Sequence, residues 1–103
     1  MIKVSVFYPN DSGASFDIDY YVKKHVPMVR GLLGTACKGA AVEHGLSGPN
    51  AGSAPIYVAM GHLYFDSVAE FQKAWSPNAS QIVGDIPNYT AIQPLIQISE
   101  VRL

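Results

Sequence analysis

Residues 56–65, Ile-Tyr-Val-Ala-Met-Gly-His-Leu-Tyr-Phe, decide the fold. In an extended strand successive side chains point to opposite faces of the sheet, and here both sets are largely apolar. One set contains Met60, His62 and Tyr64, and the other contains Leu63 and Phe65. A strand that is apolar on both faces is buried on both faces. We therefore expect this strand in the middle of the protein, with a covering layer on each side.

The flanking sequence supplies further strands and helices. β-branched residues alternate over residues 2–8, which predicts a strand. Asp17 is placed to cap a first helix, and Asp66 or Ser67 is placed to cap a second, with Ser67 and Glu70 at capping-box spacing. Pro27 should kink the first helix, or end it near His25 so that it restarts. Further predicted elements are strands at 37–46 and 94–101, a loop at 47–55, a helical turn at 78–84 and an ordered loop at 85–90.

The end of the first helical stretch is marked by two glycines. Gly31 and Gly34 follow the apolar positions of that helix, and glycine is the residue that most often ends one. The predicted order is then β-α-β-β-α-β, within a single domain that spans residues 1–103. This is the ferredoxin-like α+β class, with a four-stranded antiparallel sheet and both helices on one face.

The other face of such a sheet would be bare in a monomer. The strand at 56–65 presents apolar side chains there in either orientation, so a partner should cover it. A second copy of the chain is the simplest cover, and we expect a homodimer in which two sheets pack face to face. The alternative is a sheet that extends edge to edge.

Composition excludes several classes of protein. Only 15% of the 103 residues are charged and the net charge is −1, without a basic stripe that would bind nucleic acid. No apolar run approaches the roughly 20 residues that span a membrane. A single cysteine excludes an intrachain disulfide framework and fits a reducing compartment, so a cytoplasmic location is expected.

His25 is the first candidate for chemistry. It lies on the apolar side of the first helix, one turn after Tyr21 and just before Pro27. A histidine beside partly unsatisfied carbonyls can donate or accept a proton near neutral pH. The alternative is a structural histidine that only bonds a free carbonyl next to the proline.

The remaining histidines and the cysteine point less clearly to a function. His62 lies within the buried strand, so it needs a hydrogen-bond partner or a role, whereas His44 is expected to face solvent. The three histidines fall on three different elements without metal-ligand spacing, so no metal site is predicted. Cys37 lacks a local group that would lower its pKa, which makes it a weak nucleophile.

Six tyrosines are many for this length, and several could line a cavity between the helices and the sheet. Each offers a flat apolar surface with a polar tip, which suits an aromatic or cyclic ligand. The alternative is aromatic core packing. Tyr89, in the loop at 85–90, could belong to a lid or to a dimer contact. The others considered for the cavity are Tyr8, Tyr20, Tyr21, Tyr57 and Tyr64.

Several of these segments resemble the EthD family, named for ethyl tert-butyl ether degradation. They are Phe-Asp-Ile-Asp-Tyr-Tyr at 16–21, His-Val-Pro-Met-Val at 25–29, Gly-His-Leu-Tyr-Phe at 61–65, Ile-Pro-Asn-Tyr-Thr at 86–90, and Pro94 with Ile-Gln-Ile at 96–98. The resemblance covers almost the whole chain in the same order. It implies a dimeric α+β barrel, a group that also holds muconolactone isomerases and cofactor-free monooxygenases. Related methylmuconolactone methylisomerases use a histidine at the position of His25, but their cysteines do not map onto Cys37.

Two functions follow as hypotheses. In the first, the protein is an isomerase or oxidoreductase without a cofactor, in which His25 moves a proton and Tyr21 or Tyr20 orients a small cyclic or aromatic substrate. Its pocket would be formed by Tyr8, His62, Tyr64 and Tyr89. In the second, a non-catalytic dimer binds and delivers a hydrophobic intermediate to a monooxygenase, which the resemblance implies is a cytochrome P450 ether-cleaving system.

Overall fold

The computed structural model describes residues 1–11 and 13–103, and it contains a four-stranded antiparallel sheet with the order β2-β3-β1-β4. The two central strands, β1 and β3, are therefore the first and third in the chain. The strands are β1 (Ile2–Pro9), β2 (Gly39–His44), β3 (Tyr57–Phe65) and β4 (Leu95–Glu100). The helices are α1 (Ile18–Tyr20), a π-helical segment (Tyr21–His25), α2 (Val26–Leu33), α3 (Val68–Trp75) and α4 (Ala79–Gly84), with short 3-10 helices at Gly34–Ala36 and Ile86–Asn88.

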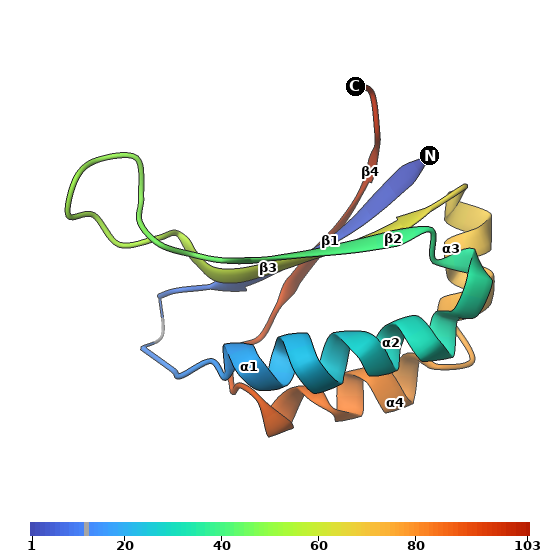
Figure 1. Cartoon of the computed structure of the whole chain (residues 1–103), viewed down its shortest axis with the longest axis horizontal. Coiled ribbons are helices and arrows are strands. Elements are labelled where there is room, and N and C mark those ends of the chain that lie inside the picture. The colour runs from blue at the N-terminus through green and yellow to red at the C-terminus, as the bar shows by residue number, and fades with distance from the viewer. Residues whose placement is uncertain (12) are drawn as a thin grey trace.

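The helices form a single layer on one face of the sheet (Figure 1). The continuous stretch from α1 to α2 lies beneath the strands beside α4, and α3 lies at one end of the layer. This arrangement confirms the predicted ferredoxin-like α+β fold. Among the described residues, no helix is long and apolar enough to cross a membrane.

The first helix continues through Pro27 without a break. The backbone N–H of Val26 bonds to the carbonyl of Tyr21, five residues back, which makes this turn a π turn. Pro27 then occupies the first turn of α2, where its missing N–H costs nothing. Both caps form as predicted: Asp17 accepts from the backbone N–H of Tyr20, and Ser67 accepts from that of Glu70. The predicted restart after His25, with Pro27 in its first turn, agrees with the bounds of α2, whereas the π turn before it was not predicted.

The prediction that Gly31 helps to end the helix is wrong. The helix continues to Leu33, and Gly34 ends it with a positive φ of 64°. Gly31 lies within the last turns and is exposed. A glycine inside a helix costs only about 1 kcal/mol relative to alanine, so packing of the apolar face on both sides of it easily carries the helix through.

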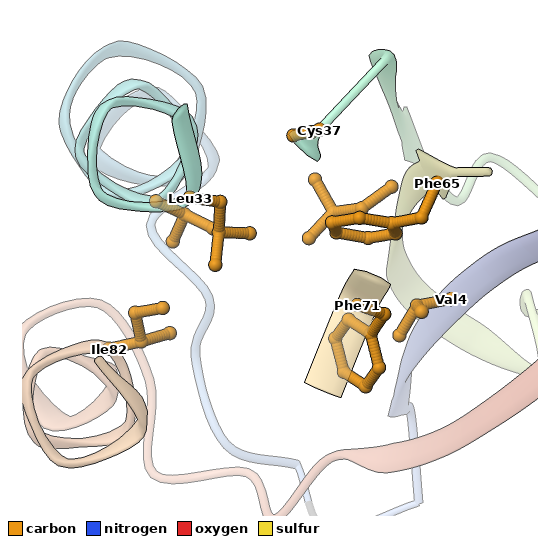
Figure 2. Packing of buried hydrophobic residues seen from close by; sticks show 8 residues of the cluster. Val4, Leu33, Cys37, Phe65, Phe71 and Ile82 are labelled. Carbon is orange, nitrogen blue, oxygen red and sulfur yellow. The ribbon is translucent and has the colours of Figure 1, made fainter. Parts of the chain in front are cut away.

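One of the two clusters of buried hydrophobic residues joins the sheet to helices α2, α3 and α4. Val4 and Phe65 from the sheet meet Leu33 from α2, Phe71 from α3 and Ile82 from α4 (Figure 2). Phe65 is fully buried. The burial of these side chains fixes the distance between the sheet and the helices. Several residues of this cluster, including Leu63 and Ile82, also line the cavity at the candidate site.

The opposite face of the sheet carries a mixture of polar and apolar side chains. Ser5 lies opposite His62 in the β1–β3 pairing and opposite Gln97 in the β1–β4 pairing, so all three point away from the helices. Phe7 and Leu95 form the next opposed pair on this face. In the described part of the chain, no helix covers this face (Figure 1).

Candidate functional site

His25 stands at the end of the π turn, and its side chain is buried between the helix and the sheet. Its ring stacks on that of Tyr21, with centroids 5.5 Å apart and an interplanar angle of 14°. Its Nδ1 lies 2.8 Å from a carboxylate oxygen of Asp85, which follows α4. Both Tyr21 and His25 belong to the π turn and both are buried. This kind of helical irregularity often occurs at functional sites.

Asp85 is held in place by three hydrogen bonds. The hydroxyl of Tyr20 donates to Oδ1 at 2.8 Å, the side-chain amide of Asn88 donates to the same oxygen at 2.9 Å, and His25 occupies Oδ2. Partial burial alone would raise the pKa of the Asp85 carboxyl, but these hydrogen bonds hold it below its usual value. Asp85 is therefore a carboxylate near neutral pH.

The imidazole of His25 is neutral near pH 7. Burial lowers its pKa below the ordinary 6.5, against the opposite effect of Asp85. A carboxylate can only accept, so the proton of the neutral ring is on Nδ1 and points at Asp85. Nε2 is left as an acceptor. A neutral, oriented imidazole of this kind is equipped to take up a proton.

Nε2 faces a cluster of phenol groups. It lies 3.4 Å from the hydroxyl of Tyr89, which in turn lies 2.6 Å from the hydroxyl of Tyr8. Burial raises the pKa of Tyr8, Tyr21 and Tyr89 far above the usual value of a phenol. These hydroxyls therefore keep their protons and act as hydrogen-bond donors.

Gly61 makes room for this cluster on the sheet. A Cβ atom added at Gly61 would collide with the hydroxyl of Tyr21. The glycine thus lets the Tyr21 side chain reach the backbone of β3. Its neighbour His62 points to the other face, where Nδ1 lies 2.9 Å from the Ser5 hydroxyl and Nε2 lies 2.7 Å from Glu43.

A small cavity opens beside His25. Its volume is about 60 Å³, less than half of the roughly 150 Å³ that holds a benzene molecule. Tyr8, Tyr21 and His25 provide polar groups in its wall, and His62 also borders it from β3. Most of the remaining wall is apolar, and it includes Val6, Val29, Leu63, Trp75, Ile82 and Ile96. Only part of a ring-sized molecule would be enclosed.

The structure separates the residues singled out from sequence into three groups. Tyr8, Tyr21 and His25 reach the cavity, and Tyr89 contacts Tyr8 and His25. Tyr20 bonds to Asp85, so it positions the carboxylate. His62 and Tyr64 are not brought into the tyrosine cluster. Their register partners are Ser5 and Lys3, which places both side chains on the far face.

Asp85 is the site residue that sequence reasoning missed. The sequence predicts only an ordered loop at 85–90, and nothing in that loop links a carboxylate to a histidine 60 residues earlier. Among the described residues, no three His, Cys, Asp or Glu side chains gather closely enough to hold a metal ion. Cys37 is buried, and its thiol donates to the carbonyl of Gly39.

Together, the fold and the site define a ferredoxin-like α+β protein with a buried histidine–carboxylate pair beside a small, tyrosine-lined cavity. The family model of the EthD domain matches residues 13–93. An EthD-like protein from Ralstonia eutropha JMP134 is 47% identical, with 99% of this chain and 92% of that chain covered and a TM-score of 0.95. The chain belongs to the EthD family.

Two more distant structures share the fold. An ethyl tert-butyl ether (EthD) family protein from Bacillus halodurans C-125 is 15% identical, with 99% of each chain covered and a TM-score of 0.67. A dimeric ferredoxin-like protein from Thermobifida fusca YX is 16% identical, with 97% of this chain and 90% of that chain covered and a TM-score of 0.58. The comparison with curated proteins finds no match.

The contact between Gly61 and Tyr21 predicts a sharp difference between two glycine substitutions. Gly61→Ala forces Tyr21 to move and should lower the free energy of unfolding by about 1–3 kcal/mol. Gly31→Ala meets nothing within 4 Å and should raise it by about 0.4–1 kcal/mol. Urea unfolding of both variants at one protein concentration measures this. Equal stability of the two would contradict the role given to Gly61.

The hydrogen bond between His25 and Asp85 predicts how the His25 ring titrates. Its pKa should lie below 6.5 in the wild type and fall further in Asp85→Asn, because the carboxylate favours the charged ring. The unfolded chain then binds this proton first as the pH falls. The stability that His25 contributes is therefore complete above pH 6.5 and is lost as the pH falls through its folded-state pKa.

NMR titration of the His25 ring measures this pKa. Asp66→Asn is the matched control, because Asp66 is an exposed carboxylate whose ion pair is with Lys38. It should leave the pKa of His25 unchanged. A His25 pKa that rises in Asp85→Asn would show that the carboxylate does not act on the ring as described.

Proposed function

We propose that this protein acts on a small, mostly apolar molecule as a cofactor-independent acid–base catalyst, with His25 as the group that receives and returns the proton. The observation that carries the proposal is the neutral, buried imidazole that Asp85 orients beside an apolar cavity. Isomerisation needs only proton transfer, which this pair can supply. A cofactor-independent oxidation would begin with the same proton removal. The substrate would be a compact cyclic or aromatic molecule whose far end protrudes from the cavity.

A second candidate is a non-catalytic protein that holds or delivers such a molecule to a monooxygenase, for example a cytochrome P450 system. The observation that favours it is that both ring nitrogens of His25 already have partners within the protein. In that case His25 would be a structural histidine, and the cavity would serve binding alone.

We also propose that two copies assemble through the open faces of their sheets. Phe7 and Leu95 lie on that face, and Leu95 is 55% exposed. The buried polar side chains there, Ser5 and His62, already have hydrogen-bond partners, so a second sheet could cover them without leaving them unpaired. The Thermobifida fusca protein of the same fold is dimeric, which supports the proposal.

Substitution of His25 separates the two candidate functions. Lactones, phenols and quinones are screened for a thermal shift and for product. If the protein is a catalyst, His25→Gln should reduce turnover by about 10²–10⁴-fold, the usual contribution of a general acid or base. His44→Gln, at an exposed histidine on β2, is the matched control and should keep full activity. Binding without product in the wild type would favour the delivery protein, and full activity in His25→Gln would remove this residue from the mechanism.

The assembly predicts a charge-sensitive dimer. Light scattering at low micromolar concentration should give the mass of two chains for the wild type. Leu95→Glu places a charge on the covered face and should shift the protein towards the monomer. Val68→Glu makes the same change in the first turn of α3, on the helical side, and should leave the dimer intact. A monomeric wild type at this concentration would contradict the proposal.

A further inference from the structure

We propose that a ligand exchanges its proton with His25 through the hydroxyls of Tyr8 and Tyr89, and that the ligand is a compact, otherwise apolar phenol, enol or enolisable carbonyl compound. This inference rests on the proposed acid–base function and names its proton path and its substrate class. It assigns the ligand contact to Tyr8 and places His25 at the inner end of the path.

The imidazole of His25 has no nitrogen free to meet a ligand. Nδ1 is bonded to Asp85, and Nε2 faces the Tyr89 hydroxyl at 3.4 Å. The faces of the ring are also in contact with aromatic groups, since Tyr21 stacks on it and the Tyr89 ring centroid lies 4.7 Å away. Only 5% of the residue is exposed. The hydroxyl of Tyr89 is the protein group that faces Nε2, so Tyr89 is placed to pass a proton to it.

The phenol groups connect His25 with the cavity. The Tyr89 hydroxyl is 2.6 Å from that of Tyr8, which is a short hydrogen bond. Tyr8 lines the cavity, whereas Tyr89 is not among the described residues that do so. The chain of contacts is Asp85, His25, Tyr89, Tyr8 and then the cavity.

Because Nε2 of the neutral His25 ring can only accept, the hydrogen bonds of this series all point from Tyr8 towards His25. Nε2 of His25 accepts from the Tyr89 hydroxyl, whose oxygen accepts from the Tyr8 hydroxyl. The Tyr8 oxygen can then accept from a ligand. When the ligand gives its proton to Tyr8, Tyr8 passes its own to Tyr89, and Tyr89 passes its own to Nε2. One proton leaves the ligand, which becomes an anion, and His25 becomes an imidazolium beside the Asp85 carboxylate. The reverse sequence returns a proton to the ligand.

The cavity wall restricts the class of ligand. Its described lining contains no Lys, Arg, Asp or Glu, so a charged substituent would be buried there without a partner. The hydroxyl of Tyr8 in this lining can bond to a single oxygen atom of a ligand. The volume of about 60 Å³ encloses this oxygen and a few neighbouring carbons. A phenol or an enolisable ketone or lactone has this distribution of polarity.

Phenol is the probe for this path. Anisole, which lacks the O–H group, is the control compound. Phenol binding is followed in the wild type by the methyl signals of Val29 and Ile82, which line the cavity, and by the ¹⁵N signals of the His25 ring. Phenol should shift both sets of signals. Anisole should shift the methyl signals and leave the His25 nitrogens unchanged, because it has no proton to share.

Two tyrosine variants test the two steps of the path separately. Tyr89→Phe should keep the methyl response to phenol and lose the response of His25. Tyr8→Phe should weaken phenol binding about five- to tenfold, the loss expected for one buried hydrogen bond. Tyr57→Phe removes a hydroxyl from a tyrosine of β3 that does not line this cavity, and it should behave as the wild type.

A His25 response that survives in Tyr89→Phe, or that anisole also produces, would overturn the path. Absence of phenol binding to the wild type would overturn the ligand class. Failure of the acid–base function is a separate result: no compound would be converted, while phenol still moved the His25 signals through Tyr89.

Discussion

The hydrogen bond between His25 and Asp85 is the contact on which the site depends. It ties the π turn of the first helix to the turn that follows α4, across 60 residues of sequence. Burial lowers the pKa of the His25 ring because it disfavours the charged form. The Asp85 carboxylate acts in the opposite direction and offsets part of this decrease. The outcome is a neutral imidazole with one defined tautomer. The rest of the cluster is arranged around the nitrogen that this tautomer leaves as an acceptor.

Such a polar cluster is tolerable in a small core because its members satisfy one another. In the described part of the chain, no buried side-chain nitrogen or oxygen lacks a hydrogen-bond partner. Tyr8, Tyr89 and His25 bond in series, and Tyr20 secures the carboxylate from outside. In a low-dielectric interior such bonds are strong, and an orphaned member would be costly. The network therefore fixes the aromatic rings as well as the proton positions.

Adjacent residues of the central strand β3 contribute to different clusters on the two faces of the sheet. Gly61 leaves space for the Tyr21 hydroxyl on the helical side, and His62 bonds to Ser5 and Glu43 on the other side. The alternation of the strand keeps the two clusters separate. One strand thus borders the cavity on one side and holds the cluster of Ser5, His62 and Glu43 on the other.

The sequence by itself determined the order of the elements, the α+β class and both helix caps, because strand alternation and the caps at Asp17 and Ser67 are local properties of the chain. It also pointed to His25 beside Pro27. Only the tertiary structure decided that a π turn precedes Pro27, that Asp85 meets His25, and that the side chain of His62 points to the sheet face opposite the helices. A period-two pattern is the same for both faces of a sheet, so the orientation of His62 depends on pairing with Ser5, 57 residues away. The hydrogen-bond partner of the buried His25 ring likewise depends on the folding of the chain, which brings the turn after α4 beside it.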